Sequence, residues 1–225
     1  MVLFPLSSSF PESMTLDTLF ELAGKEHRAS FMQTMLDYPP LRGTPELLNA
    51  IASTYKNITA QDIISFAGAD EAIYASFQML LKSGDHAVVI TPNYQSLESV
   101  PLSLCDVTGV ALDENNDWAL DTGKVRDAMR ANTKVLVINF PHNPTGALIS
   151  QQQLDELIVL CRERGIWIFS DEVYRLTEFD PADRLPQLAD VYERGISLNV
   201  TSKAYGLPGL RIGWVACQDK AWMRE

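Results

Sequence analysis

The sequence predicts an α/β fold with a mainly parallel, seven-stranded sheet covered by helices. Short apolar runs recur from about residue 62 onward, and helical patterns or turns separate them. Strands that alternate with helices form parallel sheets with both faces covered. Hydrophobic residues make up 46% of the 225 residues, which allows a sizeable core. The predicted strands span residues 63–67, 87–91, 107–112, 134–140, 166–170, 196–200 and 212–217.

The first 37 residues are weakly patterned. Ser7, Ser8, Ser9 and Pro11 favour an extended arm. A short helix is expected next, because apolar residues recur at helical spacing at Leu16, Leu19, Phe20 and Ala23. The first five residues lack a basic segment followed by a long apolar one, so no signal peptide is expected.

Four further helices are predicted between the loop at 38–43 and the last strand. Thr44 can cap the first of them, with Pro45 at its first position. Helical patterns follow near 70–82 and 122–131. The helix over 151–164 has the clearest signals: Ser150 with Gln153 forms a capping-box pattern, and Gly165 ends the helix.

Composition excludes several classes of function. With 18 basic and 29 acidic residues the net charge is −11, and an acidic surface repels nucleic-acid phosphates. No apolar run approaches the roughly 20 residues of a membrane span. The three cysteines and three histidines are scattered and form no CxxC motif, so neither a metal site nor a disulfide framework is expected. A cytoplasmic location is therefore the default expectation.

Polar and reactive side chains follow three of the predicted strands. Asn143, Asp171, Tyr174 and Lys203 each lie just beyond the end of an apolar run. Because ligands of open α/β sheets bind beyond the carboxyl ends of the strands, these side chains should lie close together. An amide, a carboxylate, a phenol and an amine are the groups that a pyridoxal phosphate site needs.

An anion would find donors where Gly68, Ala69 and Asp70 precede a predicted helix. Backbone N–H groups at a helix N-terminus bind anions, and glycine lets the backbone approach. Arg211 can bind a phosphate through two N–H groups at once. Asp70 is unfavourable beside a phosphate, so its side chain is expected to point away and to cap the helix.

These motifs resemble those of the fold-type I, class I/II pyridoxal-phosphate aminotransferases, from about Tyr38 to the last residue. The resemblance is carried by Asn143-Pro144-Thr145-Gly146, by Ser170-Asp171-Glu172-Val173-Tyr174 and by the stretch from Ser202 to Arg211. It implies the large domain of that fold, with the last strand lying between earlier ones. It also implies transfer of an amino group between an amino acid and a 2-oxo acid, and a homodimer.

The resemblance assigns three catalytic residues. Lys203 would bond to the cofactor's aldehyde carbon and later move a proton. Asp171 would keep the ring nitrogen protonated, with the alternative that it caps a helix. Tyr174 would donate to the cofactor's 3′-oxygen, together with Asn143, whose bond to Pro144 is expected to be cis.

The remaining assigned residues would bind the phosphate and the ring. The phosphate would be bound by Gly68, Ala69, Asp70, Ser202 and Arg211. Tyr94 would stack on the ring, with a packing role in the core as the alternative. Tyr38 would reach the phosphate of a partner subunit.

Residues 1–43 are expected to form an N-terminal arm with part of a small domain, and residues 44–225 the cofactor-binding domain. Relatives in the family continue well past this point, so the chain is interpreted as truncated at its C-terminal end. The arginine that binds the substrate carboxylate in the family would lie in that missing part. Three functions stay open: an aminotransferase, a lyase or cyclase on the same scaffold, and an inactive fragment.

Overall fold

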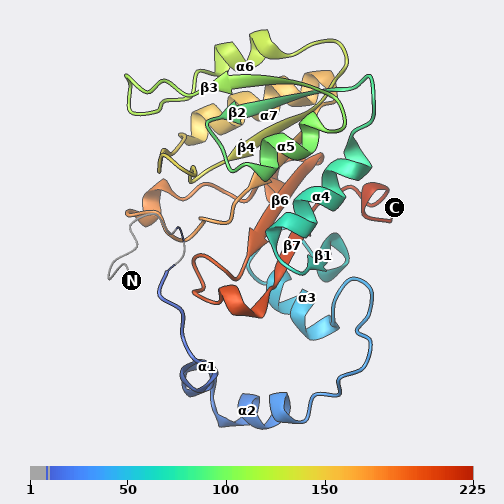
Figure 1. Ribbon diagram of the computed structural model, residues 1–225, viewed down its shortest axis with the longest axis vertical. Helices are drawn as coiled ribbons and strands as arrows, with labels where there is room; N and C mark the ends of the chain where they lie inside the picture. The colour runs from blue at the N-terminus through green and yellow to red at the C-terminus, as the bar shows by residue number, and fades with distance from the viewer. Residues whose placement is uncertain (1–8, 10, 225) are drawn as a thin grey trace.

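The computed structural model describes residues 9 and 11–224, and it shows a seven-stranded sheet between two layers of helices (Figure 1). The strands lie in the order β1-β7-β6-β5-β4-β2-β3. All seven predicted strands are present, and each strand end lies within about one residue of its predicted position. They are β1 Ile63–Phe66, β2 His86–Thr91, β3 Asp106–Ala111, β4 Thr133–Asn139, β5 Trp167–Asp171, β6 Gly195–Val200 and β7 Gly213–Ala216.

The sheet is parallel except at β7, which pairs antiparallel with both β1 and β6. A parallel pairing requires a crossover connection of a dozen or more residues, usually a helix. The link from β6 to β7 carries only the short 3-10 helix η3, Pro208–Leu210, so the chain turns back instead. The mainly parallel sheet and the place of the last strand between earlier ones are confirmed.

The helices divide between the two faces of the sheet. One face is covered by α4 (Ala69–Leu80) and α5 (Ser96–Leu102). The other face is covered by α3 (Pro45–Ala52), α6 (Thr122–Ala128), α7 (Gln151–Arg164) and α8 (Leu188–Val191). Three more 3-10 helices lie at η1 Ala60–Asp62, η2 Pro181–Asp183 and η4 Trp222–Arg224.

The helix-end signals at Thr44, Ser150 and Gly165 are confirmed. The Thr44 side chain accepts from the Leu47 N–H at 3.3 Å. Ser150 and Gln153 form both hydrogen bonds of the capping box, and Gly165 adopts a left-handed conformation with φ +66°. In contrast, α5 was not predicted, because it is short and contains Pro101, which reads as a helix breaker.

The two helices within residues 16–32 are set apart from the sheet in Figure 1. The expected helix is present as α1, Leu16–Ala23, and α2, Lys25–Met32, follows it. Neither helix has a buried residue. Of the extended arm predicted from Ser7, Ser8, Ser9 and Pro11, the first two lie outside the described residues, and residues 9 and 11–15 form neither helix nor strand. The division of the chain at residue 43 stays a prediction. Within residues 9 and 11–224, no helix is both long and apolar enough to cross a membrane.

The core on the α4 face is centred on Phe169 of β5, whose ring lies 4.8 Å from that of Phe77. Replacing Phe169 with alanine is expected to lower the free energy of unfolding by about 3–5 kcal/mol, because the lost burial leaves a cavity. Urea unfolding measures this loss. Phe179→Ala removes a fully exposed ring and serves as the matched control. A loss for Phe169→Ala no larger than that of the control would contradict the packing described here.

Candidate active site

A cavity of about 220 Å³ lies beyond the carboxyl ends of β4, β5 and β6, where the sequence placed the site. All but two of the predicted site residues line this cavity. The nine that line it are Ala69, Asp70, Tyr94, Asn143, Asp171, Tyr174, Ser202, Lys203 and Arg211. The convergence follows from the parallel register of β4, β5 and β6, which ends these strands at one edge of the sheet.

The two exceptions are Gly68 and Tyr38. Gly68 lies under the guanidinium of Arg211, and its φ is +107°. This backbone conformation favours glycine, because L side chains rarely adopt it. Tyr38 is 98% exposed and does not line the cavity.

Asp171 ends β5 and is 3% exposed. Its Oδ1 accepts from the Val173 N–H at 3.1 Å. Burial raises the pKa of the Asp171 carboxyl to about 7, against the lowering effects of that hydrogen bond and of the Lys203 charge. No helix starts at Asp171, so the alternative that it is a helix cap is wrong.

Lys203 and Tyr174 face each other across the cavity. Nζ of Lys203 lies 5.3 Å from the centre of the Tyr174 ring and donates to the backbone oxygen and Oγ of Ser9, at 3.2 and 3.0 Å. The Tyr174 hydroxyl is buried, and no described residue forms a hydrogen bond with it. A buried hydroxyl without a partner is costly, so a ligand with a hydrogen-bond acceptor at this point would stabilise it.

Asn139 is a site residue that sequence reasoning missed. It ends β4, is 2% exposed, and joins two segments of the cavity wall. Its Nδ2 donates to the backbone oxygen of Asp171 at 2.8 Å, and its Oδ1 accepts from the Asn143 N–H at 2.9 Å. The signal was a lone amide near the end of an apolar strand. The Asn143–Pro144 bond is cis, as expected.

Asp70 lines the cavity, but it does not cap α4, so that part of the expectation is wrong. The N-cap is Gly68, and no side chain caps this end of the helix. The Asp70 carboxylate instead accepts from the Tyr94 hydroxyl at 3.2 Å and from Ser96 Oγ at 3.0 Å. Tyr94 is 38% exposed, so the alternative that it packs in the core is wrong.

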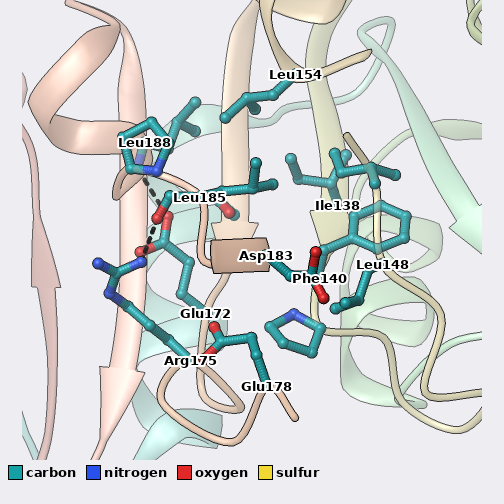
Figure 2. Close-up of a pocket in the computed structure, with 14 residues that line it drawn as sticks. Ile138, Phe140, Leu148, Leu154, Glu172, Arg175, Glu178, Asp183, Leu185 and Leu188 are labelled. Atoms are coloured by element: carbon teal, nitrogen blue, oxygen red, sulfur yellow. Dashed lines mark hydrogen bonds between the residues drawn. The ribbon is translucent and has the colours of Figure 1, made fainter. Parts of the chain in front are cut away.

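A second, smaller cavity of about 30 Å³ lies on the other face of the sheet (Figure 2). Glu172 faces it, because successive side chains of a strand point to opposite faces and Asp171 points to the first cavity. Oε1 of Glu172 accepts from the Leu188 N–H at 2.8 Å and from Ser197 Oγ at 2.9 Å. Its Oε2 is buried and has no partner among the described residues.

Burial raises the pKa of the Glu172 carboxyl from 4.5 to about 7. The folded state then holds a proton that the unfolded state releases between these two values, so this carboxyl stabilises the fold less as the pH rises through that window. Glu172→Gln does not titrate. It is expected to raise the free energy of unfolding at about pH 8 by at most about 3 kcal/mol, and to change it little at about pH 4.

Urea unfolding at the two pH values measures this difference. The control is Glu163→Gln, which changes an exposed glutamate on α7 and should leave the pH dependence as it is. An equal effect of Glu172→Gln at both pH values would contradict the titration of Glu172 in this window.

Comparisons with known proteins agree with this geometry. The model of the family "Aminotransferase class I and II" matches residues 3–224. Kynurenine–oxoglutarate transaminase 1 of Mus musculus is 27% identical over 95% of this chain and 54% of its own length. Aspartate aminotransferase of Pyrococcus horikoshii is 30% identical over 81% of this chain and 48% of its own length.

The fold has close matches among solved structures. A PLP-dependent aminotransferase from Streptococcus suis superposes with a TM-score of 0.90 at 34% identity, over 97% of this chain and 59% of that one. Aspartate aminotransferase from Thermus thermophilus gives a TM-score of 0.86 at 29% identity, over 97% of this chain and 57% of that one. The chain thus spans about half the length of the relatives it matches.

Proposed function

The chain belongs to the class I and II aminotransferases, and on this basis we propose that it forms the cofactor-binding part of an enzyme that transfers an amino group between an amino acid and a 2-oxo acid. The observation that carries the proposal is the cavity in which Lys203, Asp171 and Tyr174 meet. An amine, a buried carboxyl and an unpaired phenol at one point fit this chemistry, and packing alone does not require them.

The cofactor of the family is pyridoxal 5′-phosphate, and the residues present fit it. The unpaired Tyr174 hydroxyl and the buried Asp171 carboxyl need partners that a substituted pyridinium ring has. The first N–H groups of α4 have no partner within the helix, and Arg211 lies over Gly68 beside them. When bound, the cofactor supplies an electron sink that stabilises negative charge on the substrate's α-carbon.

Three residues would carry the chemistry. Lys203 would hold the cofactor through Nζ, and the same amine could move a proton at the substrate's α-carbon. Asp171 would accept a hydrogen bond from the protonated ring nitrogen and keep the proton there. Tyr174 would donate a hydrogen bond from its hydroxyl to the 3′-oxygen, which would supply the partner that this buried hydroxyl lacks.

The other residues would position the cofactor. Asn143 would support the 3′-oxygen, and the Tyr94 ring would hold the pyridine ring. Ser202, Arg211 and the N–H groups of Ala69 and Asp70 would bind the phosphate. Tyr38 is proposed to act in a homodimer, where its exposed ring would meet the site of a partner subunit. We place the whole protein in the cytoplasm.

Labelling of Lys203 tests this proposal directly. The chain is incubated with pyridoxal 5′-phosphate and reduced with borohydride, and the modified peptide is identified by mass spectrometry. We expect the label on Lys203, because its amine lies in the cavity. Lys203→Ala should lose the label, whereas Lys124→Ala, which changes an exposed lysine on α6, should keep it. A label on a different lysine would sink the assignment.

A further inference from the structure

Asp70 places a negative charge where the proposed site must bind an anion. It lies in the first turn of α4 and lines the same cavity as Arg211. Even so, these two oppositely charged side chains form no ion pair in the part of the chain that the structure describes. The Arg211 guanidinium donates to the backbone oxygens of Pro208 and Ala67, at 3.2 and 3.4 Å.

The Asp70 carboxylate instead accepts hydrogen bonds from two hydroxyl groups. Tyr94 donates to Oδ2 at 3.2 Å, and Ser96 donates to Oδ1 at 3.0 Å. Both donors belong to the segment that follows β2, and Ser96 is the first residue of α5. Each carboxylate oxygen therefore has a donor on the α5 side, which satisfies the charge without Arg211.

We propose that Tyr94 and Ser96 act as a hydroxyl clamp that holds the Asp70 carboxylate away from Arg211, so that the guanidinium and the α4 N–H groups stay available to a phosphate. Ser96 is a positioning residue in this arrangement, because it acts through the Asp70 carboxylate. The inference rests on the cofactor site proposed above. The two hydroxyls would thereby let the site bind an anion although an acid lies in the first turn of α4.

The Asp70 carboxylate and a bound phosphate would compete for the one guanidinium of Arg211. A released carboxylate would pair with Arg211 and repel the phosphate, and each effect weakens binding. The clamp has a second consequence, because the same hydrogen bond fixes the Tyr94 ring at the cavity wall. Burial and the Asp70 charge both raise the pKa of the Tyr94 phenol, which keeps its proton available for donation.

The test uses inorganic phosphate and pyridoxal 5′-phosphate as separate probes, with affinity measured by calorimetry. The double variant Tyr94→Phe with Ser96→Ala keeps the ring but removes both hydroxyls. We expect its Kd for inorganic phosphate to rise about fivefold, the size of one partly exposed charge interaction. Adding Asp70→Asn to the double variant should restore the affinity, because no carboxylate remains to compete.

The matched control is Tyr74→Phe with Ser103→Ala, which removes two hydroxyls from exposed residues of α4 and the end of α5 and should leave the Kd as it is. An unchanged Kd in the clamp variant would overturn the inference, and so would a failure of Asp70→Asn to restore binding. The wild-type chain is the reference for the cofactor site itself. If the wild-type chain bound neither inorganic phosphate nor pyridoxal 5′-phosphate, the proposed function itself would be contradicted.

Discussion

Replacing Lys203 with alanine is expected to lower kcat for amino-group transfer by about 10⁴-fold, the upper end of the range for loss of a proton-transferring group. The amine has two tasks in the proposed reaction, and no described lysine besides Lys203 lines the cavity. The full-length protein, loaded with pyridoxal 5′-phosphate, is assayed with amino-acid donors and a 2-oxo acid acceptor. Single-turnover measurements separate the chemical step from cofactor loss.

Lys203→Ala should still bind the cofactor, because the phosphate and ring contacts remain. Lys124→Ala should keep full activity, as expected for an exposed lysine on α6. Transfer at the wild-type rate in Lys203→Ala would remove Lys203 from the mechanism. A loss of activity that followed only from a lost cofactor would show up as a raised Kd and not as a slow single turnover.

Replacing Asp171 with asparagine is expected to lower kcat by about 10²–10³-fold, the range for one lost electrostatic contact to developing charge. The neutral amide cannot hold the ring nitrogen protonated, so the electron sink is weaker. Cofactor affinity should fall by less than about tenfold, because the phosphate contacts survive. Absorbance titration gives the Kd, and steady-state kinetics give kcat.

The neighbouring substitution Glu172→Gln is the matched control, since Glu172 faces the other side of the sheet. It should leave kcat and the cofactor Kd close to wild type. Normal turnover of Asp171→Asn together with lost cofactor binding would reverse the expected pattern and contradict the role of Asp171. The same result would assign Asp171 to the cavity's structure and not to its chemistry.

Much of the fold could be predicted because its signals are local. Each strand is a short apolar run, and Ser150, Gln153 and Gly165 mark the ends of α7 through contacts within a few residues. The candidate site followed from one further rule, that the ends of parallel strands share an edge. This rule brought Asn143, Asp171 and Lys203 together from positions far apart in the chain.

The sequence by itself therefore determined the α/β class, the seven strands and most of the cavity wall. Only the tertiary structure decided which partners the polar side chains find. Asp70 turns to Tyr94 and Ser96, and Asn139 joins Asp171 to Asn143. The spacing of apolar residues along the chain indicates which side of a helix or strand faces the core, because that spacing is a local property of the sequence. Hydrogen bonds across 20 or more residues depend on how whole elements pack, and no local pattern encodes that geometry.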